Sequence, residues 1–153
     1  MPERMRPPSR TKPRVFFDAD VLFAGSAAPS EYGASLVLLR MAEITLIDAF
    51  TCQQVVDEVE RNLAAKLEDA LAPFRLILSR CLQVVPNPDH QAIVELNGLG
   101  HPKDLPILAA AISCNCPWLV TFNQRHYQPV HPSVTVLNPG DLLLQVRDLL
   151  ARM

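Results

Sequence analysis

Short apolar runs of strand length alternate with longer amphipathic segments along most of this 153-residue chain. The apolar runs predict five strands, at residues 15–18, 44–48, 82–85, 118–121 and 134–137. We expect helices at residues 30–42, 51–66, 67–80, 88–96 and 105–115, and from residue 139 onward. Strands that alternate with helices favour a parallel sheet covered on both faces. The sequence therefore predicts an α/β fold, a three-layer α/β/α sandwich with a central parallel sheet of about five strands.

Three residues mark expected helix boundaries or bends. Thr51 and Asp104 are good N-cap residues for the helices that follow them. Pro73 falls inside the segment 67–80, so that helix is expected to bend or restart there.

The composition fits one globular domain with a basic N-terminal arm. Apolar residues make up 49% of the chain and charged residues 20%, which is typical of a globular protein. Residues 1–14 hold five basic residues and one acidic residue, a surplus of +4, so residues 15–153 carry −6 to give the chain's −2. We expect residues 1–14 to be a disordered arm and residues 15–153 to form the domain. Because the body is acidic, it is not typical of a strongly basic nucleic-acid binder, and any nucleic acid would need local basic side chains and a bridging metal.

No apolar run approaches the roughly 18 residues of a membrane helix, and no secretory apolar segment lies near the N-terminus. We therefore expect a cytoplasmic protein without a membrane partner. The four cysteines are Cys52, Cys81, Cys114 and Cys116, and their spacing lacks the paired pattern of a zinc site. Free, buried thiols in a reducing compartment are the expected state.

Two carboxylates, Asp18 and Asp20, follow the first expected strand directly. Ligands of open α/β sheets bind outside the carboxyl ends of the strands, so this position favours chemistry. Two nearby carboxylates repel each other and lose hydration unless a cation compensates, and a hard divalent metal is the simplest one. The structural alternative is that Asp18 only caps the turn after the strand.

Three further polar residues lie where a parallel sheet would bring them toward Asp18. Asp104 opens the helix before the fourth strand, Asn123 follows that strand, and Glu58 lies in the helix after the second strand. Their oxygens would suit Mg²⁺ or Mn²⁺, and such a site can activate water and hold a phosphate. The alternatives are a helix cap at Asp104 and a turn residue at Asn123.

Glu58 is the weakest of these candidates on sequence pattern. The apolar stripe of its helix does not favour Glu58 over Asp57 or Glu60, and by angle Glu60 lies nearer the stripe. A solvated surface carboxylate is the structural alternative.

In order and spacing, four segments resemble the PIN-domain family, and more closely its toxin-like branch in prokaryotic toxin–antitoxin systems. They are Phe-Asp-Ala-Asp-Val-Leu at 17–22, Val-Val-Asp-Glu-Val at 55–59, Asp-Leu-Pro-Ile-Leu-Ala-Ala-Ala at 104–111 and Leu-Val-Thr-Phe-Asn at 119–123. Arg-His-Tyr at 125–127 also looks like the segment that follows the fourth strand in that branch, and the resemblance spans about residues 14–140.

The resemblance implies a ribonuclease toxin that uses Mg²⁺ or Mn²⁺. Single-stranded RNA is the expected substrate, because its flexible backbone can enter a cleft. If the family's metal ligands are transferred to the matching positions of this sequence, they would be Asp18, Glu58 and Asp104. Asn123 stands where many members have a fourth acid, which argues against a second tightly bound metal. Asp20 replaces a residue that is often Asn, and we expect a supporting hydrogen-bonding role for it.

Other residues would support the site or bind RNA. Thr121 matches a small hydroxyl residue near the site in the family. Lys103, Arg125 and His126 flank the site and are candidates for RNA phosphate contacts, with ordinary surface residues as the alternative. The resemblance also implies a homodimer and a small antitoxin protein whose segment fills the active-site groove. The helices at 30–42 and 51–80 are the candidate surface, unless their apolar faces are only core.

Two rival functions stay open on the sequence. Asp18 and Asp20 also resemble the nucleophile motif of haloacid-dehalogenase-type phosphohydrolases, with Asp18 as nucleophile and Asp20 as acid/base. That family needs a late acidic pair, and the region after the fourth strand offers only Asn123 and Gln124. The second rival is a degenerate domain that binds RNA or a protein without cutting, because the fourth acid is missing.

Overall fold

The computed structural model describes residues 12–27, 33–129 and 131–152. Five parallel strands form one sheet in the order β3-β2-β1-β4-β5. The strands are β1 (Arg14–Phe17), β2 (Asp48–Cys52), β3 (Leu82–Val85), β4 (Trp118–Val120) and β5 (Thr135–Leu137). The helices are α1 (Ala19–Ser26), α2 (Ala34–Glu43), α3 (Gln53–Lys66), α4 (Leu71–Cys81), α5 (His90–Val94), α6 (Leu105–Ser113) and α7 (Pro139–Ala151), with 3₁₀ turns η2 (Glu68–Ala70) and η3 (Gln124–Tyr127).

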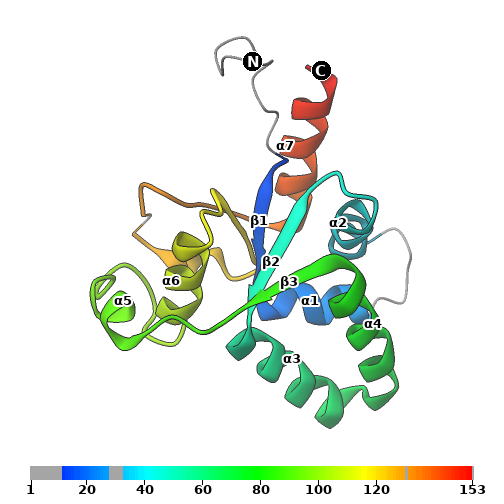
Figure 1. Cartoon of the computed structure of the whole chain (residues 1–153), viewed down its shortest axis with the longest axis horizontal. Coiled ribbons are helices and arrows are strands. Elements are labelled where there is room, and N and C mark those ends of the chain that lie inside the picture. The colour runs from blue at the N-terminus through cyan, green and yellow to red at the C-terminus, as the bar shows by residue number, and fades with distance from the viewer. Residues whose placement is uncertain (1–11, 28–32, 130, 153) are drawn as a thin grey trace, which may run out of the picture.

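Helices cover both faces of this sheet (Figure 1). The helices α5 and α6 lie on one side of the strands, and α2 and α4 lie on the other. The central strand β1 is the most enclosed, since Val15, Phe16 and Phe17 have no exposed surface. The α/β/α sandwich with a five-stranded parallel sheet is therefore confirmed.

The helix α6 seals one face of the sheet. Its sequence is apolar almost all round, and Leu105, Ile107 and Leu108 are buried together with the three alanines at 109–111. Small alanine side chains let a helix approach a sheet closely, and α6 contacts both β2 and β4. The close fit places the N-terminus of α6, and with it Asp104, beside the carboxyl end of the central strands.

The second strand lies four residues later than predicted. The residues 44–46 form a turn in which Thr45 has a φ of 67°, and β2 begins at Asp48, which pairs with Arg14 of β1. Thr51 is inside this strand and fully buried, with its hydroxyl donating to the carbonyl of Phe17 at 3.0 Å. The predicted cap at Thr51 is therefore wrong, and Cys52 precedes α3 instead. Pairing with β1 outweighs the local strand propensity of the apolar run.

A helix that the sequence pattern missed follows β1 immediately. The sequence pattern predicts no helix between the first strand and residue 30, whereas α1 occupies Ala19–Ser26 and buries Val21 and Leu22. The predicted start of the next helix, at residues 30–31, lies outside the described residues, and α2 begins at Ala34. The segment 67–80 divides as Pro73 suggested, because η2 precedes α4 and Pro73 lies in the first turn of α4.

Arg14 belongs to the folded domain rather than to the predicted arm. It opens β1, its guanidinium lies 4.2 Å from the centre of the Phe50 ring, and its Nε donates to the carbonyl of Cys114 at 3.1 Å. The residues 1–11 of the arm lie outside the described residues. All four cysteines are free, as expected. In the described part of the chain, no helix combines the length and apolarity needed to cross a membrane.

Candidate acidic active site

A polar pocket of about 660 Å³ opens at the carboxyl ends of the central strands. Seven of the residues singled out from the sequence line it: Asp18, Asp20, Glu58, Lys103, Asp104, Asn123 and His126. They come from the ends of β1 and β4, from α3, and from the N-terminus of α6. The fold therefore brings together residues that lie up to 108 positions apart in the sequence.

Asp18 is the most buried of the pocket carboxylates, with 6% of its surface exposed. Its Oδ1 accepts a hydrogen bond from the backbone N–H of Ala19 at 2.7 Å. Its Oδ2 accepts from the hydroxyl groups of Thr121 at 2.9 Å and Tyr127 at 2.8 Å. Asp18 is thus the N-cap of α1 and a pocket residue at once, so the two interpretations of this residue are compatible.

Asp20 and Asn123 form a hydrogen-bonded pair. The Oδ2 of Asp20 accepts from the side-chain amide of Asn123 at 3.0 Å and from the backbone N–H of Phe122 at 3.1 Å. The Thr121 hydroxyl lies 3.2 Å from the same oxygen. An amide donates where a second carboxylate would repel, so Asn at position 123 suits a charged Asp20.

The orientation of α3 decides which of its three neighbouring carboxylates enters the pocket. Glu58 lines the pocket. Asp57 is exposed and accepts from Gln53 on its own helix at 2.8 Å, whereas Glu60 lies 3.7 Å from Arg75 of α4. The structure therefore selects Glu58, which helical periodicity could not do.

Asp104 and His126 are in direct contact. The Nδ1 of His126 lies 2.9 Å from Oδ2 of Asp104. Asp104 occupies the predicted N-cap position of α6, but its side chain makes no capping hydrogen bond to the helix.

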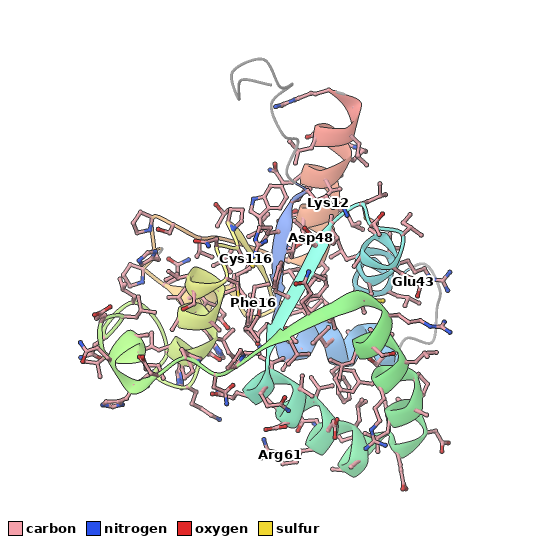
Figure 2. All side chains as sticks on the ribbon, viewed as in Figure 1. Lys12, Phe16, Glu43, Asp48, Arg61 and Cys116 are labelled. Atoms are coloured by element: carbon pink, nitrogen blue, oxygen red, sulfur yellow. The ribbon has the colours of Figure 1, made fainter. Side chains whose placement is uncertain are left out.

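The basic residues at the pocket differ in part from those predicted, since Lys103 and His126 line it but Arg125 does not. Lys103 lines the pocket, as does Arg61, which the sequence did not single out. Figure 2 shows Arg61 on α3, far from Lys12 and Asp48 at the opposite end of the sheet. Arg125 is exposed and is not among the pocket-lining residues. Phosphate contact by any of these residues stays a prediction.

Burial, and to a lesser extent the neighbouring negative charges, raises the pKa values of three pocket carboxylates. Burial, opposed by its hydrogen bonds, raises the pKa of Asp18 above its ordinary value. Burial and the negative charge of Asp18 raise the pKa of Asp20 to about 6. Burial, followed by the charges of Asp18 and Asp104, raises the pKa of Glu58. The pocket therefore concentrates negative charge that its own cations do not fully balance.

The pocket carboxylates have the right chemistry to bind a hard divalent cation, but they are too far apart to bind one together as they lie. Among the residues that the structure describes, no group of three or more His, Cys, Asp and Glu side chains is arranged to hold an ion as it stands. Asp18, Glu58 and Asp104 nevertheless offer the oxygen ligands that Mg²⁺ and Mn²⁺ prefer, and a cation would relieve their repulsion. An ion would have to draw these side chains together.

Tyr127 is a site residue to which the sequence pattern assigned no role. It is 2% exposed, and burial and the charge of Asp18 raise its pKa, so its hydroxyl stays protonated as a donor to Asp18. The resemblance included Tyr127 in a motif, but only the tertiary structure shows that contact. The pocket also includes three polar residues that the sequence did not suggest, Gln54, Asn62 and His101.

The comparisons with known proteins agree with this fold and pocket. A family model described as "PIN domain" matches residues 14–125, and the chain therefore belongs to the PIN-domain family. This membership sets aside the haloacid-dehalogenase alternative. A search of curated proteins gave no significant match.

Three solved structures share the fold at low sequence identity. VapBC2 from Rickettsia felis, bound to a DNA fragment from its promoter, has a TM-score of 0.61 at 18% identity and covers 82% of this chain and 98% of its own. PAE2754 from Pyrobaculum aerophilum has a TM-score of 0.63 at 15% identity and covers 89% and 96%. VapC20 from Mycobacterium tuberculosis, a toxin that cleaves the sarcin–ricin loop, has a TM-score of 0.57 at 16% identity and covers 78% and 98%.

Proposed function

We propose that this chain is a metal-dependent endoribonuclease that hydrolyses single-stranded RNA, and that it is the toxin of a toxin–antitoxin system. The observation that carries the proposal is the convergence of Asp18, Glu58 and Asp104 in one polar pocket of a PIN domain. The toxin VapC20, which shares this fold, is described as cleaving an RNA loop.

In this proposal Asp18, Glu58 and Asp104 hold Mg²⁺ or Mn²⁺. When bound, the ion would supply Lewis acidity that activates a water molecule and polarises a phosphoryl oxygen. Thr121 and Tyr127 fix the carboxylate of Asp18 through hydrogen bonds to the same oxygen.

The remaining steps fall to other residues of the pocket. Lys103 and Arg61 attract the RNA phosphates into an otherwise acidic pocket. A pocket carboxylate of raised pKa accepts the proton of the attacking water, because such a pKa lies closer to neutral pH. The oxygen of this water bonds to the scissile phosphorus, the bond to the 3′-oxygen breaks, and the 3′-oxygen leaves as a hydroxyl by taking a proton from solvent. Single-stranded RNA fits best, because its flexible backbone can enter a cleft.

The proposal extends to partners and location. We propose a cytoplasmic homodimer that binds a small antitoxin, with the surface of α2, α3 and α4 as the contact region. Support for the antitoxin partner comes from VapBC2, which shares the fold and was solved on a fragment of promoter DNA.

A degenerate RNA- or protein-binding domain is the second candidate. Two observations favour it: Asn123 supplies no charge, and the carboxylates of the described residues do not form a ready metal cluster. This candidate differs from the nuclease in predicting weak metal binding and no turnover.

Cleavage of a mixed single-stranded RNA by matched variants tests the proposal. We expect Mg²⁺- or Mn²⁺-dependent cleavage that EDTA abolishes. The variants Asp18→Asn and Glu58→Gln should each lose activity by at least about 100-fold, the upper end of the loss seen when even a ligand's hydrogen-bond partner is changed. The variant Asp57→Asn, one residue away on the exposed side of α3, should cleave like the wild type.

Three results would contradict the proposal. An equal loss of RNA cleavage in Asp57→Asn and Glu58→Gln would show that changes on α3 disturb the fold of the helix rather than the pocket. Cleavage that persists in Asp18→Asn or in EDTA would indicate a contaminant or another site. No cleavage, with no metal binding by calorimetry, would favour the degenerate domain.

A further inference from the structure

The contact between Asp104 and His126 in the pocket has no part in the proposed mechanism. The side chain of Asp104 is 17% exposed and that of His126 is 48% exposed, and they meet at 2.9 Å through Oδ2 and Nδ1. A carboxylate oxygen accepts, so the imidazole donates through Nδ1–H. Asp104 makes no capping bond to α6, so its carboxylate is oriented by His126 rather than by its own helix.

The backbone holds His126 in place for this contact. Its carbonyl accepts from the backbone N–H of His101 at 2.7 Å, and the backbone N–H of Asp104 donates to the carbonyl of His101 at 2.8 Å. The rings of His101 and His126 also pack together, with centroids 5.4 Å apart and planes tilted by 30°. The segment before α6 is therefore tied to the segment after β4 through His101 and His126, close to the Asp104 carboxylate.

Gly100 makes this approach possible. A Cβ atom at Gly100 would lie 2.7 Å from the carbonyl oxygen of His126, which is closer than real Cβ contacts allow. Only a residue without a side chain lets the two segments come this close.

We propose that His126 is a positioning residue that orients Asp104 as a ligand of the divalent ion, and that it is not a phosphate contact. The inference rests on the proposed function. The hydrogen bond occupies Oδ2 of Asp104 and restricts rotation of the carboxylate, which leaves Oδ1 as the oxygen to present to the pocket. Histidine and carboxylate act here as a pair, in the way that hydrogen-bond partners commonly fix the ligands of metal sites.

Variants of His126 can separate its two ring nitrogens. The side-chain amide nitrogen of Asn reaches the place of Nδ1, whereas that of Gln reaches the place of Nε2. His126→Asn therefore keeps the donor to Asp104, and His126→Gln and His126→Ala remove it. His90→Ala, at an exposed histidine of α5 outside the pocket, is the matched control.

Calorimetric titration with Mn²⁺ is the primary measurement, with thermal melting of every variant as the folding control. We expect His126→Ala and His126→Gln to weaken Mn²⁺ binding by roughly 10- to 100-fold, as changes to a ligand's hydrogen-bond partner commonly do. His126→Asn and His90→Ala should bind Mn²⁺ close to the wild type. In RNA cleavage, the loss in His126→Ala should be recovered at high Mn²⁺ without a rise in the KM for RNA.

The opposite pattern would overturn the inference. If His126→Ala binds Mn²⁺ like the wild type but has a raised KM for RNA with a weaker salt dependence, His126 contacts phosphate instead. Equal weakening in His126→Asn and His126→Ala would also count against a role through Nδ1. Asp18→Asn separates this inference from the proposed function: if it binds Mn²⁺ as tightly as the wild type, the metal site itself is misplaced and both fall.

Discussion

At the scale of single residues, Asp18 shows how a site is maintained against the cost of burial. A carboxylate that is 6% exposed loses most of its hydration, and that burial raises its pKa. Three hydrogen-bond donors, from Ala19, Thr121 and Tyr127, offset part of this cost. Two of these donors come from the segment after β4, so the site depends on the pairing of β1 with β4.

Removing one of these donors should lower stability. Thr121→Val keeps the shape of the side chain but deletes the hydroxyl that lies 2.9 Å from Asp18, and this should lower the free energy of unfolding by about 1–3 kcal/mol. The measurement is urea denaturation at pH 7. Thr135→Val, at an exposed position of β5, is the control and should change stability by no more than about 0.5 kcal/mol. Equal effects of the two changes would mean that the contact with Asp18 does not stabilise the fold.

At the scale of elements, α3 and α4 act together. α3 carries Glu58 into the pocket, and α4 packs beside it while also contacting α1 and α2. Phe74 is the one residue of α4 that is buried, at 0% exposure, so it is the main anchor of the helix in the core, and the half-buried Leu71, Ile77 and Leu78 pack against the core beside it. The position of α3, and hence of Glu58, depends in part on this anchor.

Truncation of the anchor should loosen the layer of helices. Phe74→Ala should lower the free energy of unfolding by about 3–5 kcal/mol, because it removes a buried ring and leaves a cavity. Leu76→Ala lies on the same helix, but Leu76 is 49% exposed, and its change should cost about 0.5 kcal/mol or less. Chemical denaturation of both variants measures the difference. A cost for Phe74→Ala as small as that for Leu76→Ala would show that α4 is not held by this contact.

At the scale of the whole molecule, the fold places negative charge from several elements in one pocket. Asp18 and Asp20 come from the end of β1 and the start of α1, Glu58 from α3, and Asp104 from the start of α6. Each lies within the field of the others, so repulsion between them opposes folding whenever no cation is bound. Stability should therefore depend on pH and on divalent ions.

Without metal, the protein should be more stable at pH 5 than at pH 7. The pKa of Asp20 is raised from 3.8 to about 6, so the folded chain binds this proton more tightly than the unfolded chain. That contribution to stability is complete below pH 3.8 and is lost as the pH rises through about 6. Because Asp20 is only partly buried and solvent screens its interactions, it alone should account for about 1 kcal/mol or less between pH 5 and pH 7.

Urea denaturation in EDTA at a series of pH values measures this dependence. The variant Asp20→Asn cannot titrate at this position, so its stability should vary less with pH than that of the wild type. A wild type and a variant with the same pH profile would show that Asp20 has an ordinary pKa in the folded chain.

Much of the architecture follows from local patterns in the sequence. The alternation of strands and helices, the buried strand before Asp18, and the break at Pro73 each depend on a few neighbouring residues. The expected sheet brought the four candidate site positions, Asp18, Glu58, Asp104 and Asn123, toward one another, and the family resemblance assigned their roles. All four line one pocket. Their chemical roles stay predictions, because their proximity in the pocket does not show which ligand they bind.

Tertiary structure alone decided the remaining features, because each depends on contacts between distant segments. Pairing with β1 sets the bounds of β2 at Asp48–Cys52 rather than at the predicted residues 44–48. Thr51 is therefore a buried strand residue and not the expected helix cap. Packing of α3 selected Glu58 over its neighbours on the helix, which periodicity left equivalent. The contacts of Tyr127 with Asp18 and of His126 with Asp104 span 109 and 22 residues. The sequence determined which side chains were available, and the packing of sheet and helices determined which of them meet.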